Sequence, residues 1–138
     1  MSQFGFDGTI CPILDARRGQ VYGASFTFTN GELPTRLSPD VAIKLEEFIK
    51  TLPTTGRLIF VGDGVATHAE KIAQLLGERA LIAPSHIAPI RASAGCVLAE
   101  KNPDSHVEHE ALMPIYLRQP QAVREREEQL RALGEHHD

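Results

Sequence analysis

Apolar and polar residues alternate with the period of a β-strand near the start of the chain. Ile10–Leu14 and Val21–Thr29 are predicted strands. Asn30-Gly31 is a two-residue hairpin signal, because both positions tolerate a positive φ. Leu33–Leu37 predicts a third strand, which Pro34 places at a sheet edge. One face of the second strand carries Tyr22, Ala24, Phe26 and Phe28.

The pattern then changes to the period of a helix. Ser38-Pro39-Asp40 has the features of a helix start: an N-cap hydroxyl, a proline at the first helical position and an acid at the positive end of the dipole. Pro53 ends this predicted helix. Its apolar stripe consists of Val41, Leu45, Phe48, Ile49 and Leu52.

Two short apolar runs, Leu58–Val61 and Ala80–Ala83, predict strands that are covered on both faces. A second amphipathic helix is predicted between them over Val65–Leu76, ending at a glycine. A third helix is predicted from Ser85 to about Lys101. Its small-residue face, which permits close packing, consists of Ala88, Ala92, Gly95 and Ala99.

The predicted order is β-β-β-α-β-α-β-α. An antiparallel three-strand unit, extended by two strands through right-handed helical crossovers, is typical of the ribonuclease H-like fold. That α/β fold, a mixed five-stranded sheet flanked by helices, is also the repeated lobe of the actin-like ATPases (ASKHA). We expect an irregular lead-in over residues 1–9, the lobe over 10–118 and a charged helical tail over 119–138.

Composition is that of one ordinary globular domain. The chain has 138 residues, 42% of them hydrophobic, and 14 basic against 18 acidic residues give a net charge of −4. This net negative charge argues against direct binding of nucleic acid, which usually needs a basic face. No apolar run approaches the roughly 18 residues of a membrane span. Cys11 and Cys96 lie apart in apolar surroundings and predict buried, reduced thiols in a cytoplasmic protein.

Three motifs carry a resemblance to a known family. They are Asp15-Ala16-Arg17-Arg18-Gly19-Gln20-Val21-Tyr22, Gly62-Asp63-Gly64 and Pro114-Ile115-Tyr116-Leu117-Arg118. In this order and spacing the chain resembles the TsaB proteins, which are often labelled glycoprotease-like or peptidase M22-like, over about residues 10–120. Only the C-terminal lobe of that family is matched. Such a chain is either a fragment or a shortened gene product.

The resemblance implies a non-catalytic protein without cofactor or metal. Its family supports a related catalytic TsaD-type subunit, which transfers threonylcarbamoyl to adenosine 37 of tRNA. The implied partners are that subunit, other members of the same complex, the missing N-terminal lobe and a second copy of the chain. Neither direct nucleic-acid contact nor membrane contact is expected. No residue pattern here supports the peptidase label, because no His-Glu-x-x-His occurs and no nucleophile has a base to activate it.

The first motif has two interpretations. Arg17 and Arg18 can contact a partner protein or a phosphate from an exposed hairpin. Alternatively, Asp15 pairs with one arginine to fix the turn, while Gly19 supplies a special backbone angle. We favour the structural interpretation, and we expect Tyr22 to pack in the sheet. The third motif contributes Pro114, Tyr116 and Arg118 as motif residues without an assigned role.

The second motif also has two interpretations. Gly62, Asp63 and Gly64 follow a buried strand and precede a helix, which is where α/β folds hold phosphates. Asp63 can instead be the helix N-cap, and we favour this role. A nucleotide bound only together with a partner lobe stays open.

A nuclease is the sharper alternative. The strands that end at Asp15 and Asp63 are neighbours in a ribonuclease H-like sheet, and Glu46 or Glu47 could complete a two-metal site. The pattern lacks a fourth carboxylate and a basic footprint. The run His106-Val107-Glu108-His109-Glu110 resembles a metal cluster, but we expect it to be a solvated loop.

Overall fold

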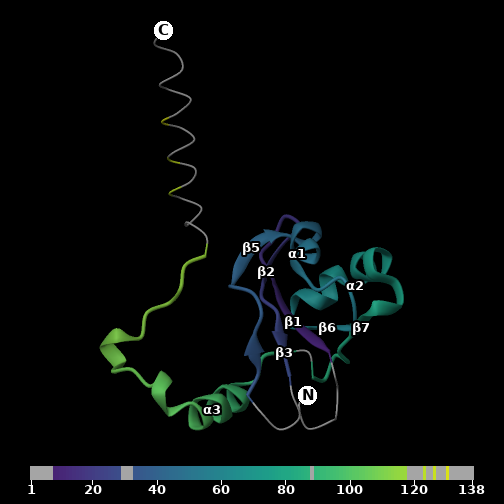
Figure 1. Cartoon of the computed structure of the whole chain (residues 1–138). Coiled ribbons are helices and arrows are strands. Elements are labelled where there is room, and N and C mark those ends of the chain that lie inside the picture. Colours follow the sequence, from purple (N-terminus) through teal and green to yellow (C-terminus); the bar gives the residue numbers. More distant parts are fainter. Residues whose placement is uncertain are drawn as a thin grey trace.

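Strands from the whole first part of the chain form one sheet (Figure 1). The structure is a computed structural model that describes residues 8–28, 33–87 and 89–117, together with Val123, Arg126 and Leu130. The seven strands in this part of the chain are β1 (Thr9–Asp15), β2 (Gln20–Gly23), β3 (Phe26–Thr27), β4 (Thr35–Arg36), β5 (Val41–Lys44), β6 (Leu58–Val61) and β7 (Ala80–Ile82).

β1 is the central strand of the sheet. On one side its residues 13–15 pair antiparallel with β2 and its residues 9–10 pair antiparallel with β3. On the other side β6 lies parallel to it. β5 continues the sheet beyond β2, β4 continues it beyond β3, and β7 lies parallel to β6. β2 and β3 together form one row of the sheet, and β4 and β5 together form another. The five rows lie in the order β4/β5, β2/β3, β1, β6, β7. This order confirms the predicted mixed sheet of a ribonuclease H-like lobe.

Three α-helices flank the sheet in the described part of the chain. They are α1 (Leu45–Thr51), α2 (Gly64–Leu76) and α3 (Ala92–Lys101), with short 3-10 helices at Gly77–Arg79 (η2), Pro103–Ser105 (η3) and His109–Ala111 (η4). Figure 1 shows α1 and α2 near each other and α3 at the opposite end of the sheet. None of the helices described is both long and apolar enough to cross a membrane.

The hydrophobic core lies between α1, α2 and one face of the sheet. Its buried residues are Cys11, Ile13, Val21, Leu45, Phe48, Leu52, Leu58, Phe60, Val65 and Ile72. Burial of this apolar surface is the main favourable term in folding. The two helices are also joined by an ion pair between Lys71 and Glu46. The hydrogen bond from the Lys71 ammonium lowers the pKa of the Glu46 carboxyl.

The first predicted helix is wrong over its first turn, because Val41–Lys44 forms β5 and α1 begins at Leu45. Ser38 does not cap a helix. Its Oγ lies 2.9 Å from both the backbone nitrogen and the Oγ of Ser25, and it accepts a hydrogen bond from that backbone N–H. β5 pairs along its whole length with β2, so its backbone groups are satisfied by the sheet.

The third predicted helix begins later than expected, at Ala92 in place of Ser85. A turn closes at Ile87, whose N–H donates to the Pro84 carbonyl at 2.9 Å. No residue of α3 is buried, so the expected burial of Cys96 is wrong, whereas Cys11 is buried as expected. The second helix and the strands on either side of it are confirmed, but β7 is not covered on both faces as expected, because Ile82 is 39% exposed. The Asn30-Gly31 hairpin, Ala88 and most of the lead-in and tail lie outside the described residues, and the domain boundaries stay predictions.

Candidate functional site

The first motif forms a tight hairpin tip between β1 and β2. Ala16 donates its N–H to the Gln20 carbonyl at 3.0 Å, and Gln20 donates its N–H to the Arg17 carbonyl at 3.0 Å. Three successive residues have positive φ: 64° at Arg17, 54° at Arg18 and 72° at Gly19. The hydrogen bond from Gln20 to Arg17 closes a turn with Arg18 and Gly19 at its central positions, where a type I′ turn needs positive φ at both. Only glycine adopts such angles without strain, so the arginines hold a backbone conformation that costs about 1–3 kcal/mol each.

Three hydrogen bonds hold the tip in this conformation. The Asp15 carboxylate accepts from the Arg17 N–H at 2.8 Å, and the Asp63 carboxylate accepts from the Asp15 N–H at 3.3 Å. The Leu45 N–H, at the start of α1, donates to the Gly19 carbonyl at 3.3 Å. The ends of β1 and β6 and the beginning of α1 therefore fix the position of the tip.

The two arginine side chains are unpaired in the described part of the chain. Asp15 does bind Arg17, as the structural interpretation expected, but through the backbone N–H and not through a guanidinium group. Arg17, Arg18 and Gly19 are all exposed. The turn thus presents two guanidinium groups to solvent on a braced backbone. Tyr22 is half-buried and lies on the opposite face of the sheet from the core.

The glycines of the second motif allow the chain to approach β1 closely. A Cβ at Gly62 would lie 2.1 Å from the Ile13 carbonyl oxygen, and one at Gly64 would lie 3.0 Å from the Asp15 nitrogen. Gly62 also has a φ of 105°, which side chains rarely adopt. The close approach is made by the protein's own backbone, so these glycines are accounted for without a phosphate.

The expected N-cap role of Asp63 is wrong. Asp63 directly precedes α2, but its φ and ψ are helical and its side chain makes no capping hydrogen bond. Its carboxylate instead reaches the end of β1. Sequence position alone did not reveal this, because the competing donor, the Asp15 N–H, is 48 residues away along the chain.

His68 is a buried polar residue that the sequence analysis left unassigned. It lies one turn after Gly64 on α2, only 7% exposed, and its Nε2 has no hydrogen-bond partner in the part of the chain that the structure describes. Such an orphaned group costs stability. The available signal was its spacing of three residues from the buried Val65 and four from Ile72, which places it on the core-facing side of the helix.

The described residues contain no group of three or more His, Cys, Asp or Glu side chains that could hold a metal ion. Glu46 is paired with Lys71, and Glu47 is exposed. In the His106–Glu110 run, the His106 Nε2 lies 3.2 Å from the Ala99 carbonyl oxygen. The His109 and Glu110 side chains are 88% exposed. The metal-dependent nuclease therefore gains no support from this geometry.

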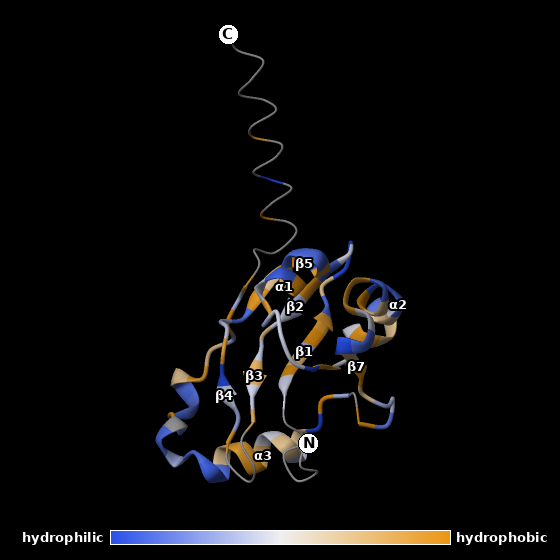
Figure 2. Ribbon diagram, turned by 45° about the vertical axis from the view of Figure 1, so that its right-hand side comes forward, coloured by the Kyte–Doolittle hydropathy of each residue, from blue (hydrophilic) through white to orange (hydrophobic). Residues whose placement is uncertain are grey.

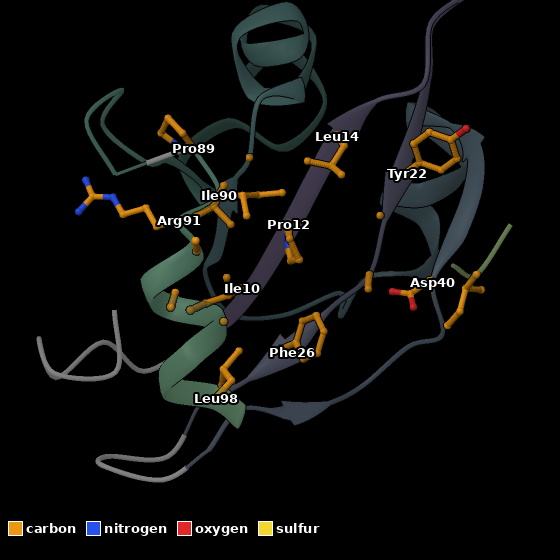
Figure 3. A pocket seen from close by; sticks show the side chains of 18 of the residues that line it. Ile10, Pro12, Leu14, Tyr22, Phe26, Asp40, Pro89, Ile90, Arg91 and Leu98 are labelled. Atoms are coloured by element: carbon orange, nitrogen blue, oxygen red, sulfur yellow. The ribbon is translucent and has the colours of Figure 1, made fainter. Parts of the chain in front are cut away.

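A large apolar trough lies on the sheet face opposite the core, with a volume of about 1020 Å³ (Figure 3). Its floor consists of Ile10, Pro12, Leu14, Tyr22, Phe26 and Phe28. Figure 3 shows Ile90, Arg91 and Leu98 on one side of the trough and Asp40 on the other. The lining also includes Ile115, Tyr116 and Leu117. Tyr116 of the third motif is 77% exposed, and Arg118 lies outside the described residues.

Comparisons with known proteins point to one family. No family model matches the chain. The "tRNA threonylcarbamoyladenosine biosynthesis protein TsaB" of Bacillus subtilis (strain 168) is 33% identical over 118 residues, which cover 85% of this chain and 50% of that protein. The resemblance to the TsaB family is thereby confirmed, and a match to half of the relative fits a single lobe.

A solved structure gives the same division. The crystal structure of an uncharacterized protein with similarity to peptidase YEAZ from Pseudomonas aeruginosa superposes with a TM-score of 0.57 at 17% identity. The match covers 81% of this chain and 50% of that one, and it shows the fold alone. The chain thus spans about half the length of each of the two proteins.

Proposed function

We propose that this chain, which resembles half of a TsaB protein, is a non-catalytic lobe that supports threonylcarbamoyl transfer to adenosine 37 of tRNA in the cytoplasm. It acts by binding the catalytic TsaD-type subunit of that pathway. The observation that carries this proposal is the 33% identity, over 118 residues, with a protein named for threonylcarbamoyladenosine biosynthesis. The peptidase-like name of the structural neighbour belongs to that protein.

The hairpin tip is the proposed contact with the catalytic subunit. Guanidinium groups bind carboxylates through paired hydrogen bonds in a fixed geometry. The tip backbone is already ordered by Asp15, Asp63 and Leu45, so binding loses little conformational freedom there. Because the chain carries a net charge of −4, an acidic protein surface is a better partner for Arg17 and Arg18 than an RNA backbone.

The absence of catalysis rests on how the candidate groups are used. The Asp15 and Asp63 carboxylates accept hydrogen bonds from backbone N–H groups at the hairpin tip. His68 faces the core, and its Nε2 has no hydrogen-bond partner, and so no nucleophile to activate, in the described part of the chain. We therefore expect the purified chain to hydrolyse neither ATP nor peptides.

Binding of the catalytic subunit tests the proposal directly. The chain is titrated against a purified TsaD-type protein, and the double variant Arg17→Ala/Arg18→Ala is compared with Arg57→Ala, which removes an exposed arginine near the opposite end of β6. We expect the double variant to weaken binding at least tenfold and the control to leave it unchanged. No binding by the unmodified chain, or equal loss in the control, would refute the proposal.

A further inference from the structure

Strand register assigns the side chains near the hairpin to the two faces of the sheet. Asp15 pairs with Val21, a core residue, so both lie on the face that α1 and α2 cover. The adjacent row joins Gln20 of β2 to Lys44 of β5. Because neighbouring positions on a strand point to opposite faces, Gln20 and Lys44 lie on the trough side, together with Tyr22. Lys44 is therefore a cation at the end of the trough side that is next to the hairpin tip.

Carboxylates gather on the helix side of this end of the sheet. They belong to the end of β1, the residue before α2 and the first turn of α1, and they are Asp15, Asp63, Glu46 and Glu47. Lys71 of α2 pairs with one of them, Glu46. An acidic partner that approaches from the helix side would meet charges of its own sign.

The trough side presents a cation instead. Lys44 is exposed and has no ion pair in the part of the chain that the structure describes. Its charge lowers the pKa of Glu46 only as the last of several causes, of which the hydrogen bond from Lys71 is the largest. The Asp40 carboxylate, which lines the trough, is already paired with Arg36 at 2.9 Å. An acidic group on this side of the sheet is therefore attracted to Lys44.

Lys44 also lies close to the two arginines of the hairpin tip, which Figure 2 shows as a hydrophilic end beyond the apolar β1. The Leu45 N–H donates to the Gly19 carbonyl at 3.3 Å, and Gln20, which pairs with Lys44, comes directly after Gly19. Paired strands lie about 5 Å apart and a turn spans less than about 7 Å, so the backbones of Lys44 and the arginines are within roughly 12 Å. Carboxylates two to four positions apart on an extended chain are separated by about 7–13 Å. One acidic segment can therefore reach both.

We propose that Lys44 is a further contact residue beside the hairpin tip, and that it binds an acidic protein segment that crosses from the tip to the trough side of the sheet. The inference rests on the proposed function, because the segment belongs to the same catalytic subunit. The planar fork of an arginine fixes the direction of a bound carboxylate, whereas a lysine ammonium attracts it as a point charge. The arginines therefore orient the segment, and Lys44 selects the side of the sheet on which it continues.

The experiment titrates the full chain against the purified TsaD-type subunit. We expect Lys44→Glu to raise the dissociation constant at least tenfold and Lys50→Glu, the matched control, to change it less than twofold. Both lysines are exposed, at opposite ends of α1, and both replacements change the net charge equally. Lys44→Glu should fold, because a carboxylate is favourable at the start of a helix, and Lys44→Arg, which keeps the charge, should bind within twofold of the unmodified chain. Gln20→Glu places a carboxylate opposite Lys44 and should weaken binding at least threefold.

The outcomes separate this inference from the proposed function. If Arg17→Ala/Arg18→Ala weakens binding but Lys44→Glu binds like Lys50→Glu, Lys44 is not a contact, and the inference is overturned while the proposed function stands. Equal weakening by both lysine variants would be a response to net charge and would also overturn it, as would a Lys44→Arg variant that binds as weakly as Lys44→Glu. Absence of binding by the unmodified chain refutes the proposed function and this inference with it.

Discussion

Replacing Gly62 by alanine tests the packing that positions the hairpin tip. Gly62 lies between β6 and α2, where its φ of 105° and its approach to β1 both exclude a side chain. An added Cβ would lie 2.1 Å from the Ile13 carbonyl oxygen, far inside van der Waals contact. That oxygen belongs to the central strand of the sheet, so it cannot move aside without shifting β1 or α2.

Two costs add in the Gly62→Ala variant. The left-handed backbone angle costs an alanine about 1–3 kcal/mol. Relief of the overlap by a shift of packed elements costs roughly another 1–3 kcal/mol, as in overpacked cores. Together they remove about 2–6 kcal/mol, a large share of the 5–15 kcal/mol by which domains are usually stable.

Gly56→Ala separates these two costs. Gly56 has a similar φ of 81°, but a Cβ there would have no atom within 4 Å. This control therefore loses only the free energy of the backbone strain, about 1–3 kcal/mol. Urea unfolding followed by circular dichroism, at one fixed chain concentration, gives both differences from the midpoints and slopes. Equal losses in the two variants would show that Gly62 does not approach β1 as closely as the structure places it.

Three further outcomes are expected in the same assay. Arg18→Gly relieves a positive φ of 54° and should stabilise the chain by about 1 kcal/mol while weakening partner binding; a destabilised variant would contradict the strained turn. Burial raises the pKa of the Cys11 thiol to about 12, whereas the thiol of the unfolded chain has a pKa near 9.0. The contribution of the neutral thiol to the unfolding free energy is therefore complete below pH 9 and falls as the pH rises toward 12. The difference in unfolding free energy between the chain and Cys11→Ala should shrink over that range, and a constant difference would argue against burial. His68→Leu removes a buried nitrogen that has no partner in the described part of the chain and should stabilise the chain by about 1 kcal/mol; a destabilised variant would contradict this.

The sheet could be predicted from the sequence because its signals are local. The alternation of apolar and polar residues predicts which side chains of β1 and β2 share a face of the sheet. The continuous apolar run Leu58–Val61 predicts a strand inside the sheet. The boundary between β5 and α1 could not be predicted this way. Val41 and Leu45 are spaced as on a helix, but Ser38 bonds Ser25, and the pairing of β5 with β2 depends on residues about twenty positions away.

In the candidate site, too, local features could be predicted from the sequence, whereas contacts between distant residues could not. The hairpin and its exposed arginines were visible in the motif, because turn chemistry is set by adjacent residues. The unusual backbone of Arg17 and Arg18 was not, since the sequence assigned special angles to Gly19 alone. The link from Asp63 to Asp15 and the trough both arise from tertiary packing. The link from Asp63 has no periodic signal along the chain, whereas the trough does, because Tyr22, Ala24, Phe26 and Phe28 alternate along one face of the second predicted strand.

The roles of Asp15 and Asp63 can be decided by conservative substitution. Each carboxylate accepts a backbone hydrogen bond, at 2.8 Å from Arg17 and 3.3 Å from Asp15, and an asparagine oxygen can accept the same bond. Asp15→Asn should therefore retain the unfolding free energy of the chain, whereas Asp15→Ala should lose about 1 kcal/mol.

A metal site makes the opposite prediction, because a two-metal centre needs the carboxylate charge. A bound cation at a hundred times its dissociation constant would stabilise the chain by about 2.7 kcal/mol, an effect that Asp15→Asn would abolish. We expect Mn²⁺ to leave the unfolding midpoint of the chain and of the asparagine variant unchanged. Stabilisation by Mn²⁺ that disappears in Asp15→Asn would assign the two aspartates to catalysis and would remove the basis for a purely supporting lobe.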